Sequence, residues 1–517
     1  MESTSIAQPA GPVEVGDKGL KKDAIGFTGG LVIALASTAP AYSLAAVIGT
    51  VVVLVGANAP GVLLLSFVPM FLIAGAFYYM NRADQDCGTT FSWVTRALGP
   101  GLGWLAGWAV CVTGILVVGS LADVASYYLF DLVGFEGARD SRFVVTVVAL
   151  GFIALMTLVC VLGTELSARL QKILTGYQVA ALLLFAVVAI AKVAAGTAPD
   201  TSADPELSWF SPFAVDDFGA LISALLIGVF IYWGWESAVN LNEETENSVT
   251  APGLAAVTST VILLVAYVGV AVAIVAFAGI DALSEFDDDP AVLGTIARDV
   301  LGSPLDKLVA LAVVISALAS TQTTILPASR TSLSMARADA MPRRLGDVHP
   351  RFHTPHVSTV LIGVLATVWY LPLKLTTENF LSDSLTALAF MIAFYYALSG
   401  LACAVYYRHE LTRSAKTFLL AGVGPVVGAL MLGYLFVRAV IEYADPADSY
   451  TGSSWFGVAP PVVTGLGFIV LGIVLMLIWR AGGHERFFGR AGFEAVPPEI
   501  ARGEASGAES LAGPPPR

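Results

Sequence analysis

Twelve stretches of the chain are long enough and apolar enough to cross a membrane as helices, and this feature limits the fold more than any other. A helix needs about 20 apolar residues to cover the hydrocarbon core of a bilayer. The stretches are residues 24-54, 58-81, 101-130, 142-163, 170-195, 218-241, 252-279, 305-335, 356-374, 381-407, 417-441 and 459-479. Because the membrane core offers no water to backbone groups, each stretch must satisfy its own hydrogen bonds as a helix. The sequence therefore predicts an all-α integral membrane protein with 12 transmembrane helices.

Composition supports this class and excludes others. Of the 517 residues, 56% are hydrophobic and only 13% are charged, whereas soluble domains contain about 25% charged residues. The net charge of -13 predicts no nucleic-acid partner. The four cysteines show neither a CxxC pattern nor Cys/His spacing, so we expect no metal site and no disulfide framework. We also expect no cofactor and no enzymatic activity, because no ATP-binding motif or paired catalytic group lies at bilayer depth.

Lysine and arginine are distributed unequally among the loops, and the side of a membrane protein with more of them faces the cytoplasm. Most of the 27 basic residues share one side when both termini are placed in the cytoplasm. The basic residues on the other side are then Arg139, Arg142, Lys192, Arg298, Lys307, Lys374 and Arg438. We therefore expect a multi-pass protein of the bacterial cytoplasmic membrane, with a cytoplasmic tail at 1-23 and a flexible cytoplasmic tail at 482-517.

Two of the predicted helices are interrupted in the middle. Residues 37-42 contain Pro40, which removes a backbone donor, and residues 230-236 contain Gly234 beside Glu236. Such breaks are tolerated at bilayer depth only where they face protein or a wet cavity. The alternative is that Pro40 merely kinks a helix whose neighbours replace the lost hydrogen bond.

The interrupted helices are the first and the sixth, so they occupy the same place in two halves of five helices each. This pattern is typical of transporters built from inverted repeats, whose substrate lies between the two breaks. The predicted repeats are 24-195 and 218-407, followed by two more helices at 417-479. Free N–H groups at a broken helix attract a carboxylate, and free carbonyl groups attract an ammonium group or a cation.

Three segments carry a resemblance to a known family. They are YWGWESAVNLNEETENSVTAPG from Tyr232, GTTFSWVTRALGPGLGWLAGW from Gly88, and LPASRTSLSMARADAMPRRLGDVHPRFHTP from Leu326. From about Gly26 to Arg413 the chain resembles the amino acid-polyamine-organocation permeases. The resemblance implies the leucine-transporter fold, a 5+5 inverted repeat with two peripheral helices. It also implies a small-molecule amino acid or amine as partner, within a lipid bilayer.

The resemblance further implies a substrate site. The expected substrate-binding residues are Ser37, Thr38, Ala39, Ala41, Tyr42, Gly107, Cys111, Gly114, Phe230, Tyr232, Trp233, Glu236 and Thr324. The family often has Gly-Ser-Gly at the first break, and Thr38-Ala39-Pro40 offers fewer N–H groups to a carboxylate. Glu236 is an ionisable group inside a predicted span, where such residues are usually functional. It is either a gate or proton-sensitive switch, or a cap that accepts nearby N–H groups.

Coupling to an ion is expected, with H+ and Na+ both open. In sodium-coupled relatives hydroxyl groups of the eighth helix bind the ion, and Ser320 and Thr321 stand at the matching place. Some proton-coupled relatives have a lysine on the fifth helix, where this chain has Gln178, which cannot titrate. Clusters of Ser and Thr in membrane helices also serve simply as packing hydrogen bonds.

The sequence thus predicts a secondary active transporter that moves an amino acid by alternating access, as an ion-coupled symporter or an exchanger. The alternatives are a polyamine or organic cation transporter of the same superfamily, and a sensor that binds an amino acid without moving it. Which amino acid or amine is recognised, the direction of transport and the oligomeric state do not follow from the sequence.

Overall fold

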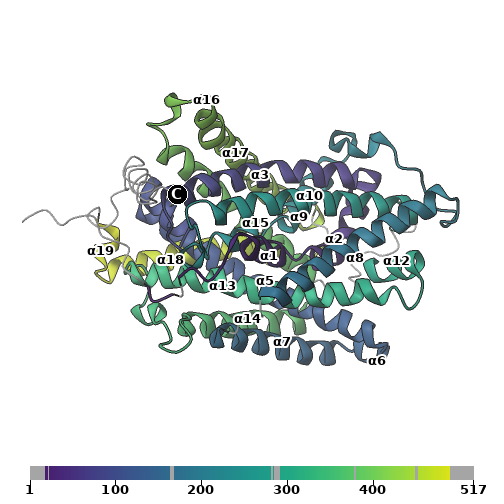
Figure 1. Ribbon diagram of the computed structural model, residues 1–517, viewed down its shortest axis with the longest axis horizontal. Coiled ribbons are helices and arrows are strands. Elements are labelled where there is room, and N and C mark those ends of the chain that lie inside the picture. Colours follow the sequence, from purple (N-terminus) through teal and green to yellow (C-terminus); the bar gives the residue numbers. More distant parts are fainter. Residues whose placement is uncertain are drawn as a thin grey trace, which may run out of the picture.

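The computed structural model describes residues 18–20, 22–163, 168–280, 283, 292–377, 380–448 and 452–489. Long helices lie side by side along its longest axis (Figure 1). The regular structure of these residues is helical, and the β-structure among them consists of two isolated bridges, Ile25 with Thr245 and Trp455 with Val458. The predicted tails fall largely outside the described residues, at 1–17 and 490–517.

The predicted number of membrane helices is confirmed for the described residues. Eleven stretches there are long and apolar enough to cross a membrane, and the first of them, Phe27–Ala83, contains two of the predicted spans. The spanning helices are α1 and α2 (Phe27–Thr38 and Pro40–Val55), α3 (Ala59–Ala83), α5 (Pro100–Val133), α7 (Arg142–Leu162), α8 (Ala168–Ala194), α9 (Phe218–Ile231), α10 (Ala251–Ala278), α13 (Lys307–Arg337), α14 (His356–Thr376), α15 (Phe380–Tyr406), α17 (Gly424–Glu442) and α18 (Pro460–Ala481).

Several short helices connect the spans. They are α4 (Thr90–Leu98), α6 (Glu136–Arg139), α12 (Val292–Leu301), α16 (Ala415–Thr417) and α19 (Glu485–Phe488). In α4 the apolar side chains of Phe91, Trp93 and Val94 are fully buried, so this segment packs as a helix where the sequence suggested only a loop. Figure 1 shows α6 and α12 at one end of the bundle and α19 at the other.

The first spanning helix is broken between α1 and α2. Ala39 has φ 52° and ψ 62°, a left-handed conformation that non-glycine residues seldom adopt. Pro40 then begins α2, where its missing N–H is not needed for a helical hydrogen bond. The hydroxyl groups of Thr38 and Ser43 cap the break, since they donate to the carbonyl oxygens of Ala34 and Thr38 at 2.9 and 2.8 Å.

The sixth span is also broken, and its second half is less regular than its first. Helix α9 ends at Ile231, and the chain continues as short 3-10 turns at Trp235–Ala238 and Asn242–Glu244. Gly234 has φ 117°, which favours glycine. A Cβ atom on Gly234 would lie 2.8 Å from the carbonyl oxygen of Ser37. The two breaks therefore touch, and only a residue without a side chain fits between them.

The face of the bundle at which α1 begins and α13 ends is called here the N-terminal face. The segment before α1 is fastened to it, because the N–H groups of Ala24 and Ile25 donate to the carbonyl oxygen of Glu244 at 2.8 and 3.0 Å. The N–H of Glu246 in turn donates to the carbonyl oxygen of Ile25 at 2.8 Å. The start of α1 and the end of the sixth span thus form one unit.

Candidate functional site

Hydroxyl groups join the two breaks to α13. The Oγ atoms of Ser37 and Ser237 lie 2.6 Å apart. Ser320 of α13 donates to the carbonyl oxygen of Ser37 at 2.7 Å, and Ser237 donates to the carbonyl oxygen of Thr323 at 3.2 Å. Main-chain carbonyl groups that the breaks would otherwise leave unpaired are therefore satisfied by three serine side chains, all of them buried.

Glu236 is buried, with 5% of its surface exposed, and both of its carboxylate oxygens accept hydrogen bonds. Tyr395 and Tyr396 of α15 donate to its two oxygens at 2.5 Å each. The N–H of Gly234 also donates to Oε2 at 3.1 Å. The expected cap is thus present, because the carboxylate accepts an N–H group of the break itself. A gating role for Glu236 stays a prediction.

The predicted aromatic residues divide between two places. Trp233 donates from Nε1 to the hydroxyl of Tyr395 and so joins the Glu236 network. Tyr42 donates to Ser120 of α5 at 2.9 Å, and its ring meets Phe230 edge to face at 6.4 Å. These residues surround the breaks.

Tyr232 points elsewhere, into the packing of α9 against neighbouring helices. Its ring contacts Phe67 of α3 and Tyr267 of α10 at centroid distances of 5.7 and 5.2 Å. Its hydroxyl is buried and has no hydrogen-bond partner among the described residues. The geometry therefore makes Tyr232 a packing residue, although it is next to Trp233 in the chain.

The small residues of α5 lie against α13 and not along an open space. A Cβ atom on Gly107 would lie 2.7 Å from Met335, and one on Gly114 would lie 2.8 Å from Ala328. The thiol of Cys111 lies 3.2 Å from the hydroxyl of Ser332. Close helix packing alone requires these small side chains. Thr324 lies in the same interface, within 4 Å of the position a Cβ on Gly114 would take.

The three ion-coupling candidates are all buried. Thr321 donates to the carbonyl oxygen of Ala317 at 2.8 Å, as a hydroxyl group within a membrane helix commonly does. Ser320 is at the first break, as described above. Neither amide atom of Gln178 in α8 has a hydrogen-bond partner in the described part of the chain.

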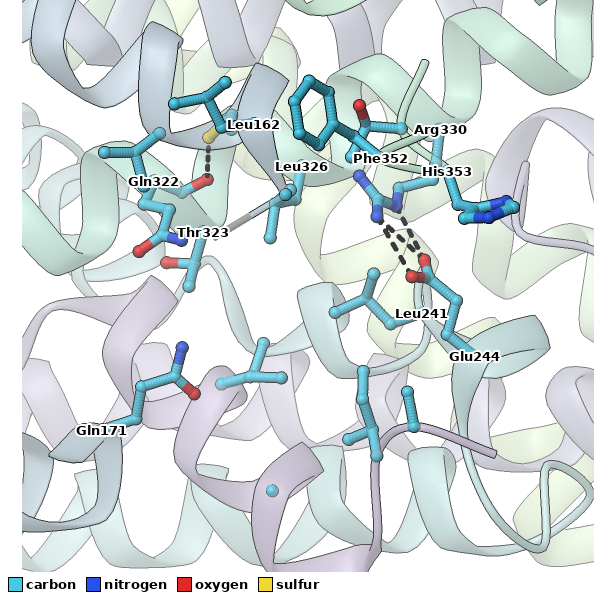
Figure 2. A pocket seen from close by; sticks show the side chains of 18 of the residues that line it. Leu162, Gln171, Leu241, Glu244, Gln322, Thr323, Leu326, Arg330, Phe352 and His353 are labelled. Atoms are coloured by element: carbon cyan, nitrogen blue, oxygen red, sulfur yellow. Dashed lines mark hydrogen bonds and ion pairs between the residues drawn. The ribbon is translucent and has the colours of Figure 1, made fainter. Parts of the chain in front are cut away.

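A cavity of about 750 Å³ extends from the N-terminal face toward the breaks. Figure 2 shows Gln171, Gln322 and Thr323 on one side of it and Arg330 paired with Glu244 on the other. The remaining lining residues are Ala24, Ile25, Gly26, Phe27, Thr28, Gly29, Ile33, Val159, Cys160, Leu162, Gly163, Lys172, Leu241, Leu326, Arg351, Phe352, His353 and Thr354. Small and apolar groups dominate near the breaks, and charged groups dominate near the face.

A cluster of acidic and thiol groups at the N-terminal face has the spacing of a metal site. Ligand atoms of Asp86, Cys87 and Glu243 lie within 4.8 Å of one another. The ammonium group of Lys18 lies among them, 3.1 Å from Asp86 and 2.7 Å from Glu243. Burial by itself lowers the pKa of Lys18, but the nearby acidic groups outweigh it and raise that pKa above its usual value. A protonated lysine thus takes the position that a metal ion would need.

Burial also raises the pKa of Cys87 well above its usual value, so its sulfur stays a thiol and not the thiolate that binds metals. The cluster is best described as an ion-pair latch between the segment before α1 and two loops. We call Lys18, Asp86, Cys87 and Glu243 the Lys18 cluster.

Two helices broken at matching places, touching each other deep inside the bundle beside a cavity, define the leucine-transporter class of membrane protein. The solved structure of MhsT in complex with L-phenylalanine has the same fold, with a TM-score of 0.53 and 17% identity over 79% of this chain and 98% of that one. The model of the family described as "Amino acid permease" matches residues 23–481, and the chain belongs to this family.

Three curated relatives show the range of the family. The methylthioribose transporter of Bacillus subtilis (strain 168) is 25% identical over 57% of this chain and 65% of its own length. The branched-chain amino acid permease BcaP of Lactococcus lactis is 22% identical over 66% of this chain and 74% of its own. The low-affinity putrescine importer PlaP of Escherichia coli (strain K12) is 21% identical over 75% and 83%. The matched region thus spans slightly less than two thirds of the first relative.

Several residues of the site were not found from the sequence. Tyr395 and Tyr396 look like interfacial aromatics in an apolar helix, and Ser237 looks like a small residue after a break. A pair of adjacent tyrosines inside a span was the available signal, because two buried hydroxyl groups require partners. Arg330 gave a similar signal, as a cation within the eighth predicted span.

Proposed function

We propose that this protein is a secondary active transporter, not an enzyme, that moves an amino acid across the bacterial cytoplasmic membrane by alternating access. The single observation that carries the proposal is the contact of the two breaks at Gly234 and Ser37, beside a cavity that reaches the N-terminal face. A solute site that is reached from one face requires a change of conformation before it can be reached from the other. Movement of the two broken helices would supply that change.

Two features support an amino acid over a polyamine. The N–H groups at the start of α2, after Pro40, have no partners within their own helix and suit a carboxylate. Glu236 is the carboxylate nearest the breaks, but Tyr395, Tyr396 and Gly234 already occupy its oxygens. A second cationic group of a polyamine would find no free anion there. The name of BcaP supports an apolar amino acid such as leucine, whereas the name of PlaP supports the amine alternative.

The proposal includes an orientation and a coupling ion. The N-terminal face carries Lys18, Lys172, Arg337, Arg344 and Arg351, in agreement with cytoplasmic termini. Coupling to H+ or to Na+ remains part of the proposal, with Ser320, Thr321 and Gln178 as candidates for the ion site.

Uptake into proteoliposomes tests the function. The purified protein would be reconstituted and given labelled L-leucine, L-phenylalanine or putrescine, with a sodium gradient, a pH gradient, both or neither. Accumulation of an amino acid above its outside concentration, dependent on one gradient, is the expected result. Accumulation of putrescine alone would favour the amine alternative. Saturable binding of leucine without accumulation under any gradient would make the protein a sensor and overturn the proposal.

A further inference from the structure

The cavity contains a buried guanidinium group whose hydrogen-bonding capacity is only partly used. Arg330 is 4% exposed, and its Nε and Nη2 donate to the carboxylate of Glu244 at 3.0 and 3.3 Å. Its Nη1 is buried and has no hydrogen-bond partner among the described residues. Figure 2 shows the guanidinium group beside Glu244 at the cavity. Two N–H groups are thus left for a ligand that accepts hydrogen bonds.

The charges of the cavity favour an anionic group on that ligand. Lys172, Arg330 and Arg351 line it, whereas Glu244 is the acidic residue among the lining residues. The carboxylate of Glu244 is already paired with Arg330, and its carbonyl oxygen fixes the segment before α1. A purely cationic solute would meet repulsion here, and a carboxylate would meet attraction.

Arg330 also lies on the path between the breaks and the N-terminal face. Thr323, whose carbonyl oxygen accepts from Ser237 at the breaks, precedes it by seven residues on α13. Seven residues of helix amount to about two turns and about 10 Å, so the two residues share one side of α13. Leu326 lies between them on the same cavity wall. A solute that leaves the breaks through this cavity must therefore pass Arg330.

We propose that Arg330 is a second, transient binding site for the carboxylate of the transported solute, used on the N-terminal side of the breaks; this inference rests on the proposed function. The carboxylate accepts hydrogen bonds from Nη1, while Glu244 keeps Nε and Nη2. Glu244 neutralises the guanidinium between transport events and weakens its hold on the solute, so that the solute can leave. The ligands of this site are small carboxylates, including zwitterionic amino acids, and amines without a carboxylate do not use it.

Exchange measured separately from the two faces tests this site. Right-side-out and everted membrane vesicles containing the full chain would be loaded with L-leucine, and exchange with labelled L-leucine would be followed from each face. The variants are Arg330→Lys, which keeps the charge but loses the planar fork, and the charge-balanced Arg330→Gln with Glu244→Gln. Isoamylamine, which is leucine without its carboxylate, serves as a competitor on both faces.

Both variants should raise the half-saturating leucine concentration from the N-terminal face about tenfold, because a charge-assisted hydrogen bond is lost. From the opposite face the change should stay below about twofold, since a general distortion of the protein would affect both faces. Inhibition by isoamylamine should be unchanged. Equal effects on both faces, or an equal loss of isoamylamine inhibition, would overturn the proposed site and leave transport itself intact. Absence of leucine exchange in the wild type would instead overturn the proposed function, and this inference with it.

Discussion

The two sides of the helix breaks differ in how their buried ion pairs relate to open space. On the N-terminal side, the Arg330–Glu244 pair forms part of the wall of a cavity of about 750 Å³. On the opposite side, Asp123 of α5 is buried between α5 and α14, where it pairs with Lys374 at 2.8 Å and accepts from Tyr370 at 2.6 Å. One pair thus borders a passage, and the other ties two helices together. A protein that must open to each face in turn needs both kinds, and the structure shows the state with the passage on the N-terminal side.

Gly234 is the contact at which the two sides meet, and its replacement should have the largest effect. Gly234→Ala places a Cβ 2.8 Å from the Ser37 carbonyl oxygen and gives a side chain to a residue with φ 117°. Strain and overpacking each cost about 1–3 kcal/mol. Uptake of labelled solute should therefore fall by about a hundredfold or more, at about 1.4 kcal/mol per factor of ten.

Gly99→Ala is the matched control. Gly99 also has a positive φ, 101°, but a Cβ there would meet nothing within 4 Å. This variant therefore contains the strain without the collision and should lose much less activity. If both variants transport like the wild type, the breaks do not touch in the working protein and the comparison of the two sides loses its pivot.

The Lys18 cluster holds the segment before α1 on the side where the cavity is, and breaking it should destabilise that side. Lys18→Met leaves Asp86 and Glu243 buried without their cation. Removing one partner of a buried ion pair costs about 3–5 kcal/mol. Thermal unfolding in detergent should shift down by several degrees, and trypsin should cleave before α1 more readily. Lys416→Met, at an exposed lysine, should change neither.

The pH dependence of this destabilisation has a defined sign. Burial alone would raise the pKa of Asp86, but Lys18 and the N–H of Gly88 outweigh it and hold that pKa below its ordinary value of 3.8. A lowered carboxyl pKa contributes stability above the ordinary value and loses it as the pH falls through the lowered pKa. Without Lys18 the burial remains, so the charged Asp86 costs stability at neutral pH. The deficit of Lys18→Met should thus be largest near pH 7 and shrink toward about pH 4; a deficit that grows on acidification would contradict the latch.

Glu236 connects the breaks to α15, and its replacement tests whether the network also responds to protons. Glu236→Gln keeps the size and one acceptor oxygen but cannot titrate. Any part of the pH dependence of uptake that comes from this carboxylate should disappear, and the rate should change by a factor of several, about the effect of one weakened hydrogen bond. Glu206→Gln at the surface is the control. An uptake profile from pH 5 to 8 that is identical to that of the wild type would leave Glu236 with its capping role alone.

The sequence predicted the parts of the molecule that local chemistry determines. Pro40 and Gly234 interrupt helices wherever they occur, so both breaks could be placed within a few residues. The apolar lengths of the spans likewise follow from the bilayer. The Lys18 cluster could not be predicted in this way, because Lys18, Asp86 and Glu243 are far apart in the chain and no spacing rule connects them.

The stripe of Gly107, Cys111 and Gly114 shows a different limit. Spacings of four and three residues place these small side chains on one side of a helix. A small stripe fits a solute and a second helix equally well, and only the position of α13 decides between them. In the structure Met335 and Ala328 of α13 take the space that the prediction assigned to the solute.

The smallest effect is expected at Asp123, on the side without the cavity. Asp123→Asn removes the charge that holds Lys374 and keeps an acceptor for Tyr370, so α5 and α14 should separate more easily. Since this state is closed on that side, weakening the pair should favour the state open to the opposite face. A shift of about 0.5 to 1 kcal/mol, the size of a weakened polar contact, would change the populations by about two- to fivefold. A cysteine placed at Ser120 should then react faster with a membrane-impermeant thiol reagent added to that face. In Arg330→Lys the same cysteine should react at the original rate, because Arg330 lies on the other side of the breaks. Faster labelling in both variants would mean that the two ion pairs are not separate controls of the two sides.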